Sequence, residues 1–492
     1  MGLITPRELV GVEELAPVHF IAIGGSGMNG IASAFLDLGY EVSGSDRQDS
    51  KYLRGLQERG ARTHIGHAAE QLGNAKTVIA SSAIRDDNPE LVEARARGLR
   101  ILHRSEALGS LMLGRRGVAV AGTHGKTTTT AMIARVLTEL GTDPSYLIGG
   151  AFLGSTTGGH IGGGEALVVE ADESDGSFLQ YPAEVAVVTN VDPDHLTNWG
   201  TPEAYADGFV RFATKPELKL LIVSADDPGA VELVRTIKES SARVPEIITF
   251  GTDPAADLRL TDLELTGTGS TFTLTDTRRA STGQHRGGPV RLAVPAKYNA
   301  LNATATYAVA SYFGGEDSAV REALGQFGGT HRRFELVGTV DGVRVYDDYS
   351  HHPTEVGNML GETARPAAGE GRVVACFQPH LYTRTRDFWR EFAVALEQAD
   401  EVIVMDVCGD REDPIDGING ALVSDAIRPG TANVTYQPVW DEAAPTVAGI
   451  ARPGDVVVTI GCGDVTKVAP KIVDELRRRH AAPAGAESRD AV

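Results

Sequence analysis

Short apolar runs recur along the whole chain, each bounded by Gly, Asp or Asn residues. They occupy residues 19–23, 77–80, 117–121, 166–169, 185–189, 220–223, 373–377, 402–405 and 456–460. Each run is too short for a core helix and lacks polar alternation, which is typical of parallel strands buried on both faces. Stretches of helical period follow most of them, for example residues 30–38, 128–140 and 388–398. This repeated order of strand and helix predicts an α/β fold with right-handed crossovers.

The chain is long enough for about three domains, since 492 residues exceed the roughly 100–200 residues of a common domain. Glycine turns follow three different groups of predicted strands, which indicates three separate sheets. A Thr-rich alternation between about 257 and 295 predicts antiparallel strands appended to the central domain, and small polar residues from 481 onward predict a frayed end. We place the domains at residues 1–113, 114–329 and 330–492.

A glycine-rich turn, Gly25-Ser-Gly27-Met-Asn-Gly30, directly follows the first predicted strand and opens a helix. Glycine lets backbone N–H groups approach a diphosphate at the positive end of the helix. Asp46 ends the next predicted strand about 20 residues later, where an acid commonly accepts a hydrogen bond from a ribose hydroxyl. The pattern predicts a nucleotide diphosphate site, and on its own it leaves a nicotinamide-dependent dehydrogenase open. The alternative is that these glycines only allow close packing of helix and strand.

The segment AVAGTHGKTTTTAMIARVL carries the sharpest chemical signal in the chain. A predicted strand ends at Ala121, a glycine turn follows, and Lys126-Thr127 begin an amphipathic helix. Backbone N–H groups of residues 122–128 can surround a phosphate, Lys126 supplies positive charge to its oxygens, and the Thr127 hydroxyl suits Mg²⁺. Val120 stands where the common GxxxxGK[ST] pattern begins with Gly. The segment predicts binding of a nucleoside triphosphate.

Two acidic clusters follow predicted strands of the same central domain. The segment ALVVEADESDGSF contains Glu170, and the segment VAVVTNVDPDHLTNWG contains His195. Mg²⁺ prefers hard oxygen ligands, and ligands bind where the strands of a parallel sheet end. We therefore expect Glu170 and His195 to serve the metal or the phosphates. The alternative for each cluster is an ordinary solvated loop.

Composition excludes some functions. The chain has 46 Lys plus Arg against 66 Asp plus Glu, a formal charge of −20, which argues against a nucleic-acid partner. Helix N-termini and one lysine can still hold a polyphosphate without a large basic surface. Three cysteines, at 376, 408 and 462, fit neither a disulfide scaffold nor a CxxC metal site, which favours a reducing cytoplasm. Because no apolar run approaches the roughly 18–20 residues that span a bilayer, we expect no membrane insertion.

Taken together, the motifs resemble those of the Mur ligases. GTHGKTTT, EADESDGSF, TNVDPDH, VPAKYNALNA, RRFE, YDDYSHHPTE and FQPHLYTRT occur in this order, with IGGSGMNGIA before them. The combination is similar to the family of UDP-N-acetylmuramate–L-alanine ligases, and it runs from about residue 19 to 464. GTxGKT alone would fit any Mur ligase or a folylpolyglutamate synthetase. The resemblance implies a Rossmann-like N-terminal domain, a P-loop central ATPase domain and a Rossmann-like C-terminal domain, which bind a UDP-sugar, ATP and the amino acid in that order.

The resemblance also implies roles for single residues. For the UDP-sugar it points to Gly24, Gly25, Ser26, Gly27, Asp46, Ser82 and His124. For ATP it points to Gly122, Thr123, His124, Gly125, Lys126, Thr127, Thr128, Asn299, Asn302, Arg333 and Asp348. It implies Mg²⁺ or Mn²⁺ at Thr127, Glu170 and His195, and it places Tyr349, His351 and Arg384 at the muramoyl or alanine end. The catalytic residues would be Lys126, His195, Arg333 and His351.

The implied activity is ATP-dependent joining of L-alanine to the lactoyl carboxylate of UDP-N-acetylmuramate through an acyl phosphate, in peptidoglycan precursor synthesis. The near alternative is the recycling ligase that adds a whole tripeptide to the same UDP-sugar. An NAD oxidoreductase leaves the phosphate loop unexplained, and the retained Lys126, Thr127, Glu170 and His195 argue against a non-catalytic regulator. We expect a cytoplasmic monomer or weak homodimer whose partners are UDP-N-acetylmuramate, L-alanine and ATP.

Overall fold

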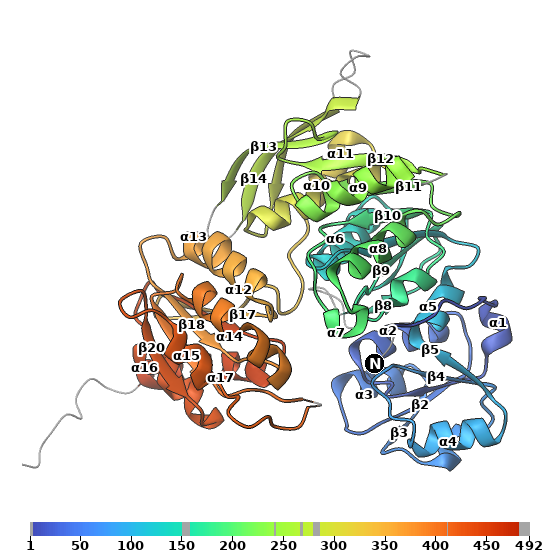
Figure 1. The fold of residues 1–492 in the computed structure, drawn as a ribbon, viewed down its shortest axis with the longest axis horizontal. Helices are drawn as coiled ribbons and strands as arrows, with labels where there is room; N and C mark the ends of the chain where they lie inside the picture. Colours follow the sequence, from blue (N-terminus) through green and yellow to red (C-terminus); the bar gives the residue numbers. More distant parts are fainter. Residues whose placement is uncertain are drawn as a thin grey trace, which may run out of the picture. The chain divides into compact units, whose positions relative to one another are not determined.

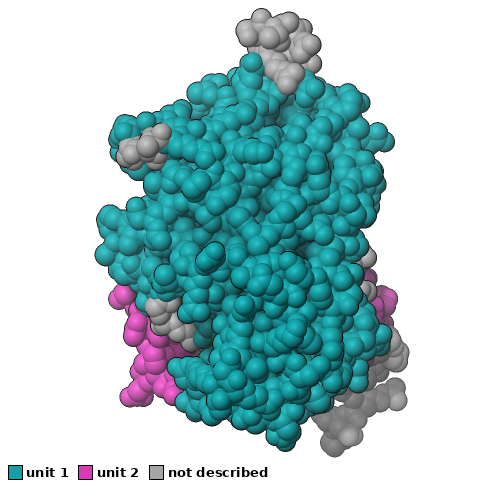
Figure 2. All heavy atoms as spheres, turned by 90° about the vertical axis from the view of Figure 1, so that its right-hand side faces the viewer, with its two compact units in different colours: residues 1–263, 271–293, 298–330 teal, residues 264–270, 294–297, 331–492 magenta. Residues whose placement is uncertain are grey.

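The computed structural model describes residues 3–149, 158–240, 243–265, 269–278, 286–410 and 412–481. The chain forms three sheets, which Figure 1 colours in sequence order. It divides into two compact units, of which unit 1 comprises residues 1–263, 271–293 and 298–330 and unit 2 comprises residues 264–270, 294–297 and 331–492. Figure 2 shows unit 1 in teal and unit 2 in magenta. Unit 1 holds the first sheet and nearly all of the second, and unit 2 holds the third.

The first sheet has five parallel strands in the order β3-β2-β1-β4-β5. The strands are β1 (Val18–Ile21), β2 (Val42–Asp46), β3 (Arg62–Ile65), β4 (Thr77–Ala80) and β5 (Arg100–His103). The helices are α1 (Val12–Leu15), α2 (Ser26–Asp37), α3 (Lys51–Glu58), α4 (Pro89–Ala96) and α5 (Arg104–Met112), with a 3-10 turn at Ala69–Leu72. Because the strands are parallel, the carboxyl ends of β1, β2 and β4 lie at one edge of the sheet, next to the first glycine turn.

The second sheet has ten strands in the order β15-β14-β13-β12-β11-β10-β6-β9-β7-β8. The strands are β6 (Arg116–Ala121), β7 (Ser145–Leu147), β8 (Gly159–His160), β9 (Ala166–Glu170), β10 (Val185–Val188), β11 (Leu220–Ser224), β12 (Glu246–Gly251), β13 (Leu258–Leu265), β14 (Ser270–Asp276) and β15 (Arg286–Leu292). The helices are α6 (Lys126–Glu139), α7 (Leu196–Trp199), α8 (Pro202–Ala213), α9 (Pro228–Ser240), α10 (Lys297–Tyr312) and α11 (Asp317–Leu324), with a 3-10 turn at Ser177–Gln180. β6 pairs in parallel with β10 on one side and β9 on the other, so the carboxyl ends of these strands meet.

Both sheets of unit 1 share one hydrophobic core. Phe35 of α2 belongs to the same buried cluster as Phe178, Phe212 and strand residues of β6 and β10. Phe178 stacks on Phe212 with the ring centroids 4.9 Å apart. A shared core leaves little freedom for the two sheets to move separately, because native interiors are close-packed.

The sheet of unit 2 has six strands in the order β16-β17-β21-β18-β19-β20. The strands are β16 (Glu335–Val340), β17 (Val343–Asp348), β18 (Val373–Phe377), β19 (Glu401–Met405), β20 (Asn433–Gln437) and β21 (Val456–Ile460). The helices are α12 (Pro353–Met359), α13 (Arg365–Ala368), α14 (Tyr382–Leu396), α15 (Ala421–Ala426), α16 (Ala443–Ile450) and α17 (Val468–Ala481), with a π-helical turn at Leu360–Ala364 and 3-10 turns at Trp440–Glu442 and Asp464–Lys467. Only β16 pairs in antiparallel fashion among the strand pairs of this sheet, so its centre is a parallel sheet. Two buried clusters cover its two faces.

The prediction of a three-domain α/β fold with parallel sheets is confirmed. The strands predicted at 77–80, 373–377 and 456–460 coincide with β4, β18 and β21. The strand predicted at 19–23 ends at Ile21, because Ala22 has a φ of 62° and begins the glycine turn.

The start predicted for the phosphate-loop helix at Lys126-Thr127 is confirmed, and its apolar period at 128–140 begins only after a polar first turn. The helix predicted at 388–398 begins earlier, at Tyr382, because its first turn is polar. The Thr-rich segment becomes β13, β14 and β15, which extend the second sheet. The sequence predicts a frayed end from 481; Ala481 is the last residue of α17, and the residues after it lie outside the described ranges. No helix within the described ranges has both the length and the apolar character needed to cross a bilayer.

Candidate active site

The phosphate loop connects β6 to α6 in unit 1. Residues 122–125 form the turn between these elements. Gly122 has a φ of 129° and Gly125 a φ of 84°, values that L side chains rarely adopt. A Cβ on Gly122 would also lie 2.0 Å from Thr189 Oγ1. The backbone path therefore requires both glycines, as the sequence motif suggested.

The residues that follow β10 hold this loop in place. The Thr189 hydroxyl donates to the His124 carbonyl at 2.6 Å, and the His124 N–H donates to Asn190 Oδ1 at 2.8 Å. The Thr123 hydroxyl donates to the Asp192 carbonyl at 2.7 Å. The His124 imidazole Nε2 lies 3.5 Å from Asp192 Oδ2. These contacts preorganise the loop, so that little rearrangement is needed when a phosphate binds.

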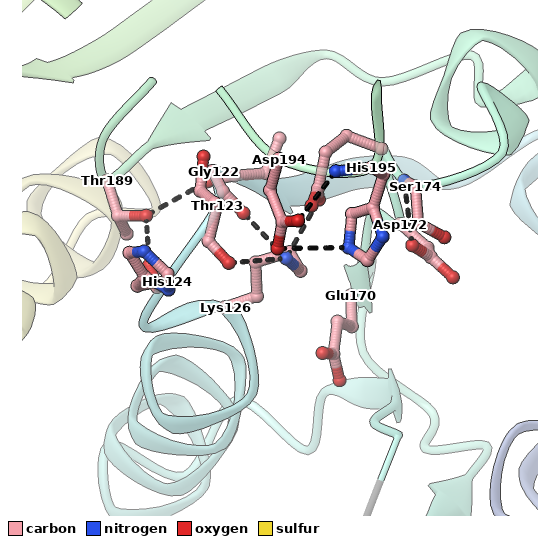
Figure 3. Close-up of polar contacts among 12 residues, drawn as sticks. Gly122, Thr123, His124, Lys126, Glu170, Asp172, Ser174, Thr189, Asp194 and His195 are labelled. Carbon is pink, nitrogen blue, oxygen red and sulfur yellow. Dashed lines mark hydrogen bonds and ion pairs between the residues drawn. The ribbon is translucent and has the colours of Figure 1, made fainter. Parts of the chain in front are cut away.

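The Lys126 ammonium is nearly buried against the loop and one carboxylate. Its Nζ donates to the carbonyls of Gly122 at 2.7 Å and Thr123 at 3.0 Å (Figure 3), and it lies 2.8 Å from Glu173 Oε2. Burial favours the neutral amine, but Glu173 and other nearby acids outweigh burial and raise the pKa of Lys126. Burial raises the pKa of Glu173 to about 7, although Lys126 opposes that shift. Lys126 therefore keeps its positive charge at neutral pH.

Thr127, in the first turn of α6, lies in direct contact with Glu170 at the end of β9. The Thr127 hydroxyl donates to Glu170 Oε1 at 2.7 Å, and Glu170 Oε2 accepts the Gly149 N–H at 2.8 Å. A hydroxyl and a carboxylate are hard oxygen donors of the kind that Mg²⁺ prefers. The two side chains therefore fit a divalent cation beside the phosphate loop.

His195 lies at the N-terminus of α7. It has a φ of 54°, and its N–H donates to Asp194 Oδ1 at 2.6 Å. The Asp194 carboxylate also lies beside the imidazole, with Oδ2 3.5 Å from Nε2 (Figure 3). Asp194 thus orients the ring in the segment between β10, the strand next to β6, and α7.

Asn302 lies against the phosphate loop. It belongs to the second turn of α10, and its Oδ1 lies 3.2 Å from the position of a Cβ on Gly125. Asn302 is 5% exposed, and its Nδ2 has no hydrogen-bond partner among the residues that the structure describes. Asn299 is also buried, one turn earlier on the same helix. A buried amide donor beside the loop fits an acceptor on a bound nucleotide.

The first glycine turn lies between β1 and α2. The Gly24 N–H donates to Asp46 Oδ2 at 2.9 Å, and Asp46 Oδ1 accepts the N–H of Gln48 at 3.3 Å. Asp46 therefore supports the turn itself, in addition to the ribose role predicted for it. Ser82 follows β4 and is half-buried at the same edge of the sheet.

In unit 2 the predicted residues gather where β17 ends. The guanidinium of Arg333 lies 5.2 Å from the ring centroid of Tyr349 and 3.8 Å from Glu355. Asp348 is buried and accepts the N–H groups of Phe334 and Ser350. Burial raises the pKa of Asp348, although Arg333 opposes that shift. The neighbouring Arg332 has a structural role instead, because it donates to Asp347 at 3.2 Å and to the Gly461 carbonyl at 2.6 Å.

His351 is held by its Nδ1 atom. Nδ1 lies 3.1 Å from the Tyr349 carbonyl and 3.3 Å from Glu355 Oε2. Two acceptors at Nδ1 favour the tautomer with its hydrogen there, which leaves Nε2 as a proton acceptor. Burial lowers the pKa of His351 to about 4; Glu355 opposes this shift, and Arg384 and Arg333 add to it. The imidazole is therefore neutral at pH 7.

We expect His351 to lower the stability of the folded chain in acid. Its pKa is about 4 in the folded state and about 6.5 when exposed, so the unfolded state binds the proton first as the pH falls. The wild type should lose roughly 2 kcal/mol more than His351→Asn between pH 7.5 and pH 5. Urea unfolding at both pH values measures this difference. Equal losses in the two proteins would contradict the lowered pKa.

The structure also brings in a residue that the sequence motifs did not single out. Arg104 begins α5 and donates from Nη2 to Asp172 Oδ2 at 2.7 Å, within the acidic segment after β9. The only local signal is a capping box, in which His103 and Glu106 cap the start of this helix. That signal marks a helix start and says nothing about Asp172, which lies 68 residues further along the chain.

Comparison with known proteins places the chain in a family. Three family descriptions match in order: "Mur ligase family, catalytic domain" at residues 17–116, "Mur ligase middle domain" at 120–310, and "Mur ligase, glutamate ligase domain" at 332–463. The chain belongs to the Mur ligase family. It is similar over nearly its whole length to proteins named UDP-N-acetylmuramate–L-alanine ligase.

Two curated relatives and two solved structures resemble this chain to different degrees. The UDP-N-acetylmuramate–L-alanine ligase of Cutibacterium acnes is 52% identical, covering 96% of this chain and 98% of its own. That of Thermobifida fusca is 48% identical, covering 97% and 100%. The crystal structure of UDP-N-acetylmuramate–alanine ligase MurC from Thermotoga maritima has a TM-score of 0.78 at 27% identity, covering 94% and 99%. A murein peptide ligase from Psychrobacter arcticus has a TM-score of 0.68 at 22% identity, covering 93% and 98%, which shows the fold alone.

Proposed function

We propose that this chain joins L-alanine to the lactoyl carboxylate of UDP-N-acetylmuramate, with ATP as co-substrate, in peptidoglycan precursor synthesis. The observation that carries the proposal is the phosphate loop with Lys126, Thr127 and Glu170 in contact around it. Support comes from full-length relatives whose names state this activity. The proposal includes a cytosolic reaction, in keeping with three free cysteines.

A carboxylate is a poor electrophile towards an amine, so the reaction needs ATP. In the proposed first step, an oxygen of the lactoyl carboxylate bonds to the γ-phosphorus, and the bond from that phosphorus to the bridging oxygen breaks and releases ADP. In the second step, the alanine nitrogen bonds to the acyl carbon and phosphate leaves with the electron pair. Lys126 lowers the barrier of the first step because its charge offsets the repulsion between the carboxylate and the phosphates.

Mg²⁺ or Mn²⁺ belongs to this proposal as the cation of the ATP site. Thr127 and Glu170 would hold it through the oxygens that now hydrogen-bond to each other, and His195 would serve a second cation or the phosphates. Such a cation, when bound, neutralises phosphate charge. Asn299 and Asn302 would contact the adenine, with the buried Asn302 Nδ2 as a donor.

The sugar nucleotide would occupy the first glycine turn. The N–H groups in the first turn of α2 have no partners within the helix, and they form the positive end of its dipole. Gly24, Gly25, Ser26 and Gly27 would form this anion site, with Asp46 and Ser82 at the same sheet edge. The His124 side chain would face the reacting carboxylate.

The residues of unit 2 complete the proposed reaction. Arg333 and Asp348 would contact the phosphates and ribose of ATP, and Tyr349 and Arg384 would face the muramoyl or alanine end. The alanine amine must lose a proton as it attacks. We assign this proton to Nε2 of His351, because the lowered pKa keeps that imidazole unprotonated at neutral pH.

The decisive measurement is phosphate release from ATP with UDP-N-acetylmuramate and either L-alanine or the tripeptide L-Ala-γ-D-Glu-diaminopimelate. We expect release with L-alanine, and a product that is heavier by one alanine residue. Release only with the tripeptide would replace this proposal by the recycling ligase. Absence of release with either would contradict both ligase activities.

A further inference from the structure

Arg104 lies between the two nucleotide sites proposed for unit 1. Its Nη2 donates to Asp172 Oδ2 at 2.7 Å and lies 3.9 Å from Asp175 Oδ2. Its Nη1 lies beside the first glycine turn, since a Cβ placed on Gly27 would lie 3.3 Å from it. Gly27 belongs to the first turn of α2, which is the proposed diphosphate site. One guanidinium therefore contacts the acidic segment after β9 and borders the first glycine turn.

The positive charge of Arg104 lies beside the N-terminus of α2. The N-terminus of a helix carries partial positive charge, so a guanidinium beside it is unfavourable unless an anion is shared between them. Asp172 accepts a hydrogen bond from Nη2 of Arg104. Among the residues that the structure describes, none accepts a hydrogen bond from Nη1 or Nε of Arg104. Arginine offers a planar set of five donors, and such an edge matches phosphate oxygens well.

On its other side, Arg104 is connected to the phosphate loop through alternating charges. Asp172 Oδ1 accepts the Ser174 N–H at 3.0 Å, so the Asp172 carboxylate is fixed on both oxygens. The next residue, Glu173, lies 2.8 Å from Lys126 Nζ. Asp172 and Glu173 are adjacent in the chain, so one short segment contacts both Arg104 and Lys126.

We propose that Arg104 binds the diphosphate of the UDP-sugar through its Nη1 edge while its Nη2 edge holds Asp172, and that it thereby couples the sugar-nucleotide site to the ATP site. A diphosphate on the Nη1 edge offsets part of the Arg104 charge, so the combined field of Arg104 and Asp172 at Lys126 becomes more negative. Arg104 is a binding residue for one nucleotide and a positioning residue for the other. This inference rests on the proposed function, because it needs a UDP-sugar in the first glycine turn.

Binding measurements on the full chain test the contact with the diphosphate. We expect Arg104→Gln to weaken the binding of UDP-N-acetylmuramate and of UDP by the same factor, about tenfold or more, since both carry the diphosphate. Arg104→Lys should recover part of the loss, because the charge returns without the planar fork. Arg97→Gln, which removes an exposed pair with Glu93 in the same domain, is the matched control and should bind like the wild type. Loss for UDP-N-acetylmuramate alone, or no loss, would overturn the assignment.

A second variant separates the loss of the diphosphate contact from a loss of folding. Arg104→Gln leaves Asp172 without its cation, whereas Arg104→Gln with Asp172→Asn removes both charges. We expect the double variant to melt close to the wild type and still to bind UDP at least tenfold more weakly. Wild-type affinity for UDP in the double variant would show that the single variant acted through Asp172 alone, and would overturn the contact.

The coupling between the sugar-nucleotide site and the ATP site is measured separately, through the affinity for an ATP analogue. The dissociation constant of a non-hydrolysable ATP analogue is measured with and without saturating UDP-N-acetylmuramate. We expect the ratio of the two constants to differ from one in the wild type and to approach one in Arg104→Gln. A ratio of one in the wild type, or an unchanged ratio in the variant, would overturn the coupling. Failure of the wild type to bind the UDP-sugar would instead contradict the proposed function.

Discussion

Lys126→Met should lower kcat for phosphate release by roughly a thousandfold, because it removes the cation that we propose faces the β and γ oxygens of ATP. The same change should destabilise the folded chain, since the Glu173 side chain is 1% exposed and Lys126 is its cation partner. Breaking a buried pair of this kind costs about 3–5 kcal/mol when the remaining group is ionised. Steady-state assays and urea unfolding measure the two effects.

The loss of stability in Lys126→Met should depend on pH. Burial already raises the pKa of Glu173 to about 7 in the presence of Lys126, so without that cation the pKa rises further. A raised pKa in the folded state means that stability is retained in acid and lost as the pH rises. The variant should therefore be closer to the wild type at pH 5.5 than at pH 8.

The double variant Lys126→Met with Glu173→Gln separates the two effects. It should recover stability at pH 8, because no buried carboxylate remains unpaired, and it should stay inactive. Recovery of turnover together with stability would mean that Lys126 serves the fold and not the reaction.

Thr127→Val should lower kcat by roughly 10²-fold or more while the KM for UDP-N-acetylmuramate changes little. The substitution keeps the shape of the side chain but removes the hydroxyl that contacts Glu170 Oε1 at 2.7 Å, and with it one proposed ligand of the cation. Thr127→Ser retains the oxygen and should stay within a few-fold of wild-type kcat. Steady-state kinetics over a range of Mg²⁺ concentrations makes the comparison.

A threonine further along the same helix is the control for Thr127→Val. The Thr138 hydroxyl donates to the Ala134 carbonyl within α6, at 2.8 Å and away from the loop. Thr138→Val makes the same chemical change and should leave kcat near the wild-type value. If Thr127→Val behaved like Thr138→Val, the Thr127 hydroxyl would have no part in the reaction.

Much of the ATP side of the site could be predicted from the sequence, because its signals are local. The turn at residues 122–125 needs glycines, and the structure gives Gly122 and Gly125 positive φ angles. Thr127 and Glu170 are 43 residues apart, yet Thr127 begins the helix after the turn that follows β6, and Glu170 ends the neighbouring strand β9. Such strand ends meet at one edge of a parallel sheet. Because β6 and β9 are neighbours in the sheet, the phosphate-loop motif and the acidic motif meet in the contact between Thr127 and Glu170.

Other contacts could not be predicted in this way. Asp46 has the position expected of a ribose ligand, but the structure shows one of its oxygens bound to the Gly24 N–H. Glu173 stands in a run of acids that reads as a solvated loop, but it is buried beside Lys126. Its burial depends on the helices and strands packed around it, which no local pattern specifies.

By itself, the sequence determined the α/β architecture and the chemistry of the phosphate loop, because the period of apolar residues and the glycine turns act over a few residues. Only the tertiary structure decided which charges meet across the shared core of unit 1. Arg104 lies 77 positions from Gly27 and 68 from Asp172, and the packing of two sheets brings it to both. Charge pairing at such separations depends on how whole elements pack, so composition and spacing alone do not specify it.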